Sequence, residues 1–229
     1  MNSFKINYIY DPLCGWCYAS APALQGLVQA YSDQLEMHPS GLFSGAGARP
    51  LNLEWADYAW TNDQRIGART GLVFSTAYHQ DVLLGTDIQF DSGPINRALT
   101  AVRRIDRTLE PRLLHDLQVA RYVQGQDTAS ARVIGRVAAE LLVAVGRPSN
   151  EQAFAQALND DHELSSQTDR RVRETKALMG KLGIRGVPQV LIHIEERVYT
   201  LESNTLYGGP DLLISEVKKT VEHHRSLVN

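Results

Sequence analysis

Two cysteines, Cys14 and Cys17, are the only thiols of the chain, and Gly15 and Trp16 separate them. At this spacing in a helix the two side chains lie on one face, with Cβ atoms about 5–6 Å apart. A disulfide needs Cβ atoms about 3.5–4.5 Å apart, so a small adjustment of the first turn permits both the dithiol and the disulfide. Because that bond closes a very short loop, it restrains the unfolded chain little. Redox chemistry explains the pair better than stability does.

The attacking species in disulfide exchange is a thiolate, and the amino end of a helix favours negative charge. Cys14 stands where an extended segment gives way to a helical pattern. We therefore expect Cys14 to be the nucleophile and Cys17, one turn further along, to resolve the mixed disulfide. Gly15 would keep the approach to Cys14 open, and Trp16 would offer an apolar surface beside it.

Two other interpretations of the cysteine pair stay open. Half of a zinc site would need two further ligands, but there is no second CxxC, and the adjacent pair His223–His224 is expected in a frayed tail. Two buried, inert cysteines are the other alternative. The position of the motif after a strand and before a helix favours redox chemistry, and no metal is expected.

Composition excludes several classes of protein. The 229 residues carry a net charge of −3 and are 43% hydrophobic, which is typical of a chain with an ordinary core and not of a general nucleic-acid binder. No apolar run approaches the roughly 20 residues of a membrane span. Two cysteines are too few for a secreted disulfide scaffold, and the first residues lack the pattern of a secretory signal. These features indicate a cytoplasmic protein.

The elements that must position the cysteines follow from periodicity. Residues Phe4–Tyr10 alternate as a strand, and a helix is expected from Cys14 to about Tyr31, kinked at Pro22. A second, parallel strand over Leu35–Phe43 and a loop over 44–47 follow. Asp11 reads as a turn or helix-capping residue more readily than as a proton acceptor for Cys17.

The middle of the chain is mostly helical and its end is mixed. Further helices are expected over 53–70, 94–107, 111–122, 130–145, 150–158, 165–182 and from Pro210 to about His224, with hairpin strands over 190–194 and 198–201. The strands at the two ends should share one sheet. The charged run Arg103–Arg107 reads as a solvated helix face. The aromatic residues Phe43, Trp55, Tyr58 and Trp60 are either core residues or, with Trp16, the lining of a substrate groove.

The segment Tyr10–Tyr18 resembles the active-site segment of the DsbA-like branch of the thioredoxin superfamily. Pro22, five residues beyond Cys17, and Gly186-Val187-Pro188, just before a strand, fit the same pattern. The stretches Arg97-Ala-Leu and Tyr122–Asp127 are similar to kappa-class glutathione transferases and 2-hydroxychromene-2-carboxylate isomerases. The resemblance implies an α/β thioredoxin fold with a large helical insertion. Residues 1–48 and 170–229 would form the thioredoxin-fold domain, and residues 49–169 the inserted helical domain.

The resemblance also implies roles at the site. Pro188 would be cis and packed against the disulfide, and Val187 would pair its backbone N–H and C=O with an extended substrate. The chain would then be a thiol–disulfide oxidoreductase or protein disulfide isomerase acting on protein or small-molecule disulfides and thiols. The alternative is a glutathione-dependent transferase or isomerase, but those relatives usually carry serine at the first cysteine position. No permanently bound cofactor is expected. Since a third thiol is absent, an external reductant or oxidant must recharge the couple, with glutathione as a candidate co-substrate.

Overall fold

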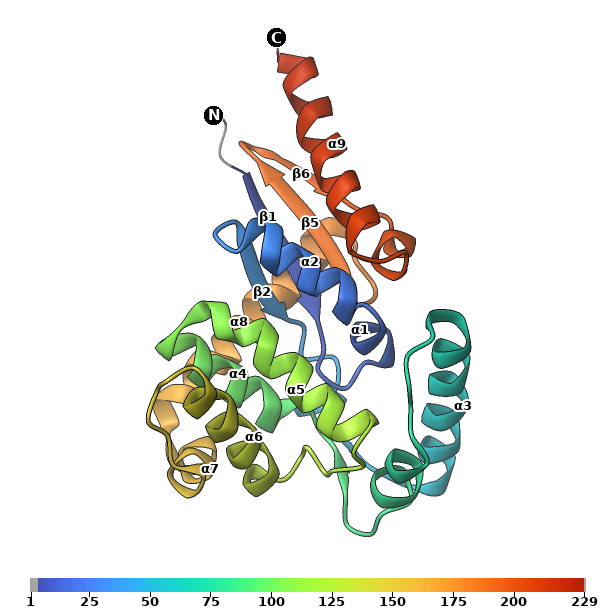
Figure 1. Cartoon of the computed structure of the whole chain (residues 1–229), viewed down its shortest axis with the longest axis vertical. Coiled ribbons are helices and arrows are strands. Elements are labelled where there is room, and N and C mark those ends of the chain that lie inside the picture. The colour runs from blue at the N-terminus through green and yellow to red at the C-terminus, as the bar shows by residue number, and fades with distance from the viewer. Residues whose placement is uncertain (1–3, 229) are drawn as a thin grey trace.

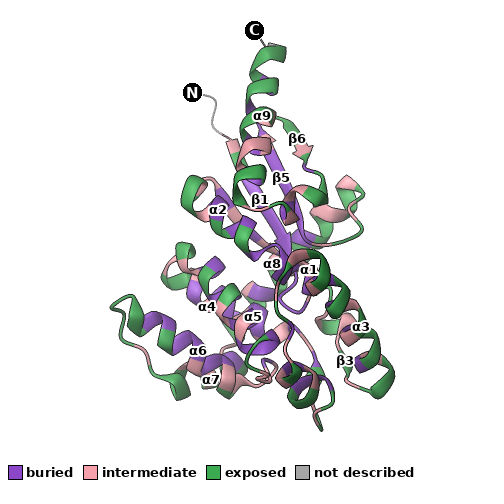
Figure 2. Ribbon diagram, turned by 45° about the vertical axis from the view of Figure 1, so that its right-hand side comes forward, coloured by how far each residue is buried: buried purple, intermediate pink, exposed green. Residues whose placement is uncertain are grey.

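A computed structural model describes residues 4–228 of the chain (Figure 1). Its main sheet has four strands in the order β2-β1-β5-β6, and β1 is parallel to β2 whereas β1–β5 and β5–β6 are antiparallel. The strands are β1 (Phe4–Tyr10), β2 (Leu35–Pro39), β5 (Gln189–Ile194) and β6 (Arg197–Thr200). The prediction that the two ends of the chain share one sheet is confirmed. Figure 2 shows that β1 and β5, in the middle of the sheet, are buried over most of their length.

The second strand is shorter than predicted. β2 ends at Pro39 instead of Phe43, and the backbone N–H of Ser40 still donates to the Tyr10 carbonyl at 2.7 Å. Gly41 then adopts φ +62, a left-handed conformation that glycine reaches without strain, and the chain turns away from the sheet. The predicted loop that follows contains one short 3₁₀ turn, η1 (Gly45–Gly47).

The predicted helix after Cys14 is two helices, not one kinked helix. α1 (Gly15–Ala19) stops at Ser20, and α2 (Ala21–Tyr31) begins directly after it. Pro22 lies in the first turn of α2, where a missing N–H leaves no helical hydrogen bond unmade. The Ser20 hydroxyl bonds the Cys17 carbonyl at 2.9 Å and the Tyr8 hydroxyl at 2.6 Å, which ties the junction to β1.

Helices cover the sheet and extend below it. α2 packs against α9 (Pro210–Val228) in front of the sheet, and α8 (His162–Leu182) contacts β2 (Figure 1). The remaining helices are α3 (Leu53–Thr70), α4 (Gly93–Ile105), α5 (Glu110–Tyr122), α6 (Ala131–Ala144) and α7 (Glu151–Asp160). In Figure 1, α3 stands apart from α6 and α7, and it contacts α1 instead. The division at residues 48/49 and 169/170 stays a prediction, and α8 runs unbroken across the second of these positions.

Several short elements were not predicted. β3 (Arg49–Pro50) and β4 (Gln89–Phe90) form a small antiparallel sheet, and Tyr78–Leu83 is a π-helical stretch, η2. Short 3₁₀ turns occupy η3 (Arg107–Leu109) and η4 (Ser203–Tyr207). α8 begins three residues earlier than predicted because the Asp161 side chain caps it, accepting from the Leu164 N–H at 2.8 Å.

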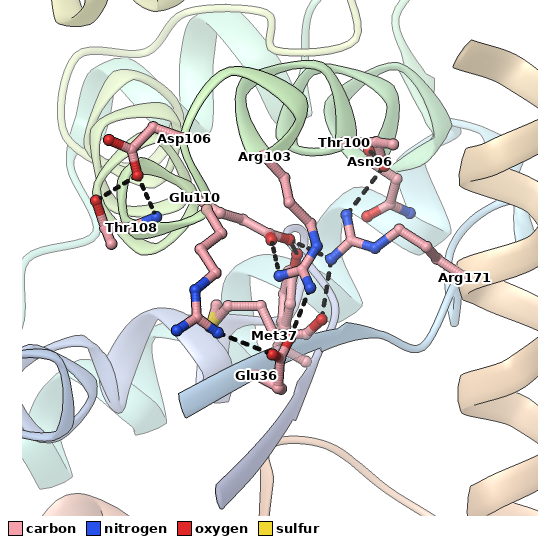
Figure 3. Close-up of polar contacts among 11 residues, drawn as sticks. Glu36, Met37, Asn96, Thr100, Arg103, Asp106, Thr108, Glu110 and Arg171 are labelled. Carbon is pink, nitrogen blue, oxygen red and sulfur yellow. Dashed lines mark hydrogen bonds and ion pairs between the residues drawn. The ribbon is translucent and has the colours of Figure 1, made fainter. Parts of the chain in front are cut away.

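A charge network centred on Glu110 joins the middle helices to the sheet (Figure 3). The Glu110 carboxylate is fully buried and accepts from Arg171 at 2.6 Å, from Arg103 at 3.4 Å and from the Tyr10 hydroxyl at 3.0 Å. Arg103 also pairs with Glu36 of β2 at 2.6 Å. The predicted solvated face is half-exposed at Arg103, whose side chain is 29% exposed and pairs with carboxylates from two other elements.

The C-terminal histidine pair also differs from the prediction. α9 continues to Val228, and His224 is buried rather than in a frayed tail. Its Nδ1 lies 2.9 Å from the Tyr199 hydroxyl, and its Nε2 lies 3.6 Å from a carboxylate oxygen of Glu195. Within residues 4–228, no group of three or more potential metal ligands comes together. None of the helices in that range has both the length and the apolar character needed to cross a membrane.

Candidate active site

Cys14 is held at the start of α1 by the turn that ends β1. The Asp11 carboxylate accepts from the Leu13 N–H at 3.0 Å, and the Cys14 N–H donates to the Asp11 carbonyl at 3.1 Å. Cys14 is the N-cap residue, and its carbonyl accepts from the N–H groups of Cys17 and Tyr18 at 2.9 and 3.1 Å. The side chain stays half-buried, so a substrate sulfur can reach it.

Cys17 lies one turn further along and is 1% exposed. Its sulfur accepts a 3.5 Å contact from the backbone N–H of Asp11. Burial, reinforced by the neighbouring Cys14 sulfur, raises the pKa of the Cys17 thiol well above its ordinary value. The two thiols are close but not bonded. One accessible sulfur is therefore backed by a second that stays protonated and shielded from solvent.

The loop before β5 faces Cys14 from the other end of the chain. The Val187–Pro188 peptide bond is cis, as predicted, and the Cys14 sulfur lies 3.6 Å from the Val187 carbonyl oxygen. Pro188 is buried and Val187 is half-buried. The structure thus brings Cys14 and Cys17 together with Val187 and Pro188, although Val187 follows Cys14 by 173 positions in the sequence.

A groove of about 470 Å³ opens beside this pair of loops. Trp16 forms part of its wall, and its ring packs on Tyr207 with centroids 4.8 Å apart. The lining is Trp16, Arg69, the segment 182–189, Thr200, Ser203 and Tyr207. Its size fits a small peptide-like ligand. Tyr207, Arg69 and Arg185 were not predicted as site residues, because each comes from a different element.

The structure gives a reason for glycine at position 15 that differs from the expected one. Gly15 is buried and lies outside the lining of the groove. A Cβ added at this position would stand 2.3 Å from Oδ1 of Asp63, which approaches from α3. Glycine is therefore needed for the close contact of α1 with α3, and its predicted part in substrate binding stays a prediction.

Asp63 itself is part of a buried polar cluster that the sequence analysis missed. It is 5% exposed and accepts from the Tyr78 hydroxyl at 2.9 Å. Burial raises the pKa of Asp63 to about 7, opposed by the Tyr78 hydrogen bond and the charge of Arg121. Arg121 is 1% exposed, and its guanidinium lies over the rings of Tyr78 and Phe90 at 5.5 and 5.3 Å. An aspartate on the apolar face of α3 was the signal available in the sequence.

The expected aromatic groove is not formed by the five aromatic residues together. Trp55 packs on Phe43, with centroids 6.3 Å apart, and Trp60 stacks on His79 at 4.3 Å. Tyr58 is 61% exposed. Only Trp16 of the five lines the groove, so the packing interpretation holds for Phe43, Trp55 and Trp60.

Asp11 is a turn residue, as favoured, but it is not the cap of α1. Its carboxylate accepts from the Leu13 N–H, the Phe43 N–H at 3.1 Å and the Ser92 hydroxyl at 3.0 Å. The atom of Asp11 that reaches Cys17 is the backbone nitrogen. Burial raises the pKa of Asp11, and these donors counteract that rise. Asp11 thus joins the active-site turn to the loop after β2 and to the start of α4.

The strand order, the helical insertion and the cis-proline loop beside a CxxC helix are those of DsbA-like thioredoxin folds. The chain belongs to the DSBA-like thioredoxin domain family, whose model matches residues 5–206. No curated protein sequence matches the chain.

Solved structures give the more particular likeness. The cytosolic disulfide reductase DsbM from Pseudomonas aeruginosa is 28% identical with a TM-score of 0.81, covering 95% of this chain and 98% of that one. A structure of the same DsbM with GSH has 27% sequence identity and a TM-score of 0.80, and the match covers 95% of this chain and 99% of that one. A putative protein disulfide isomerase from Nitrosomonas europaea shares the fold, with 22% identity, a TM-score of 0.72 and coverage of 97% of this chain and 99% of that one. A 2-hydroxychromene-2-carboxylate isomerase also shares it, with 16% identity, a TM-score of 0.54 and coverage of 97% and 98% of the two chains.

Proposed function

We propose that this chain is a thiol–disulfide oxidoreductase that works as a disulfide reductase, with Cys14 as nucleophile and Cys17 as resolving cysteine. One observation carries the proposal. A half-buried Cys14 sulfur lies 3.6 Å from the carbonyl of Val187, next to a cis proline, while Cys17 is buried one turn behind it. In this arrangement a substrate disulfide can reach the Cys14 sulfur, and the substrate backbone can pair with that of Val187.

The chemistry runs in two exchanges. The Cys14 thiolate attacks one sulfur of the substrate disulfide, a bond forms between them, and the other substrate sulfur leaves as a thiolate. Cys17 then gives up its proton and attacks Cys14, which releases the second substrate thiol and leaves a Cys14–Cys17 disulfide. The substrate gains two electrons and the protein loses two. The high pKa of the buried Cys17 thiol keeps it protonated, so Cys14 makes the first attack.

Glutathione is the proposed source of electrons. Since the chain has only two thiols, both in the motif, reduction of the Cys14–Cys17 disulfide must come from outside. Two glutathione molecules would regenerate the dithiol and leave as glutathione disulfide. The DsbM structure with GSH supports a glutathione site in this fold. DsbM is a cytosolic disulfide reductase, which supports a cytoplasmic location for this chain. Protein disulfides are substrates on the same proposal, through pairing with Val187.

The test uses the uncharged substrate hydroxyethyl disulfide with glutathione as reductant. The wild-type chain should reduce it, Cys14→Ser should be inactive, and Cys17→Ser should accumulate a mixed disulfide of Cys14 with glutathione that mass spectrometry detects. Full activity of Cys14→Ser would end the proposal. Unimpaired glutathione conjugation or isomerisation by Cys17→Ser, without disulfide turnover by the wild type, would instead favour the glutathione-dependent transferase or isomerase.

A further inference from the structure

We propose that Arg69 and Arg185 select the substrate of this site, favouring small disulfides that carry carboxylates on both sides of the sulfur. The inference rests on the proposed function and names its substrate class. Glutathione disulfide and mixed disulfides of glutathione are the peptide examples of such compounds, since each glutathione has a carboxylate at either end and its cysteine in the middle.

The charge of the groove differs from that of the chain. The net charge of the whole sequence is −3, yet the groove lining includes two arginines and no aspartate or glutamate. Arg69 comes from the last turn of α3, and Arg185 comes from the loop between α8 and β5 that leads to Val187. The two cations therefore border the same space as the backbone edge on which a substrate would lie.

Neither cation is neutralised by the protein. Across residues 4–228, no carboxylate forms an ion pair with Arg69 or Arg185. Arg69 donates to the amide oxygen of Asn204 at 3.1 Å, a neutral partner. Its guanidinium lies 5.7 Å from the ring centroid of Trp16. Arg69 is thus oriented beside the CxxC motif by uncharged groups, which leaves its charge available to a ligand.

A carboxylate-bearing thiol peptide matches this arrangement. With its sulfur at Cys14 and its backbone against Val187, the peptide would extend both ways along the groove, so that its two ends meet cations. The volume of about 470 Å³ suits a ligand of that size. Because Arg69 belongs to α3, the middle helices would contribute directly to the choice of substrate, in addition to covering the site.

The experiment compares charge variants on substrates of different charge. Pre-reduced protein is mixed with glutathione disulfide, hydroxyethyl disulfide or cystamine, and single-turnover oxidation is followed by alkylation and mass spectrometry. Arg69→Gln and Arg185→Gln should each lower the rate constant for glutathione disulfide by about fivefold, the upper range for an exposed ion pair. The rate with uncharged hydroxyethyl disulfide should change by less than about twofold, and that with cationic cystamine should rise.

Two controls separate charge from structure. Arg65→Gln removes an exposed arginine from the same helix without touching the groove lining, so it should behave as the wild type. Arg69→Lys keeps the charge and should retain most of the preference for glutathione disulfide. Raising the salt concentration should reduce the preference of the wild type, because exposed charges are screened.

Binding gives a readout that does not depend on redox turnover. Calorimetry with S-methylglutathione, which cannot exchange, should show the same fivefold weakening in each glutamine variant. Equal losses on all three disulfides, or unchanged binding of S-methylglutathione, would overturn the charge selection. Failure of the wild type to exchange with hydroxyethyl disulfide would refute the proposed function instead, whatever the arginine variants do.

Discussion

Replacing Asp63 with asparagine should change how the stability of the fold depends on pH. Burial raises the pKa of this carboxyl to about 7 from an ordinary value of 3.8. The folded chain therefore holds the proton more tightly than the unfolded chain between these two values. The stabilisation is fully present below pH 4 and is lost as the pH rises through 7.

The size of the effect follows from the shift. Each unit of pKa corresponds to about 1.36 kcal/mol, so a shift of roughly three units means that the free energy of unfolding falls by about 4 kcal/mol as the pH rises from below 4 to above 7. About 3 kcal/mol of this fall lies between pH 5 and pH 8. Asparagine keeps an oxygen that can accept from the Tyr78 hydroxyl but has no proton to lose. The variant should therefore lack this part of the pH dependence.

The assay is urea unfolding at several pH values between 5 and 8, comparing Asp63→Asn with the wild type. Taking the difference between the two proteins removes the contributions of other buried groups such as Glu110 and His38. Asp57→Asn, on the exposed side of the same helix, controls for the loss of a carboxylate. If the unfolding free energies of Asp63→Asn and the wild type run parallel over this range, the reasoning is refuted.

Three further results are expected. Gly15→Ala should lower the free energy of unfolding by about 1–3 kcal/mol, because the added Cβ would stand 2.3 Å from Oδ1 of Asp63. An unchanged midpoint of urea unfolding would contradict that contact. Glu110→Ala should lower the free energy of unfolding by about 3–5 kcal/mol in thermal unfolding, since the largely buried Arg171 loses its carboxylate partner; a loss below 1 kcal/mol would mean that the network contributes little. Iodoacetamide should label Cys14 of the folded, reduced chain well before the buried second thiol, as peptide mapping can show; equal labelling of both would disprove the shielding.

The parts of the site with local signals could be predicted from the sequence. Cys14 and Cys17 stand at a fixed spacing after an alternating strand, and a Val-Pro step precedes a second strand. The longer helices could be predicted as well, because an apolar stripe repeats over several turns in each of them. These features need no knowledge of which segments meet in space.

The missed features depend on contacts between distant segments. β3 and β4 have two residues each, too few to show any periodicity. Asp63 lies on the apolar face of α3, but its partner Tyr78 comes from another element, and the carboxylates that pair with Arg103 come from β2 and α5. His224 is buried because Tyr199 of β6 lies against it, which no pattern near the C-terminus indicates. Arg69 and Arg185 likewise become neighbours of one groove only in the folded chain.

α8 is one continuous helix that leads from the middle helices to the cis-proline loop. Its 21 residues span roughly 30 Å without a break, from the capped start beside α4 to Gly183, four residues before Val187. Arg171, in the middle of the helix, is clamped to β2, α4 and α5 through Met37, Thr100 and Glu110. The start of the helix is held as well, because Arg104 of α4 pairs with Asp161 and Glu163. The cis-proline loop follows the other end of α8, so the contacts that fix this helix against β2, α4 and α5 also help to position Val187 beside Cys14.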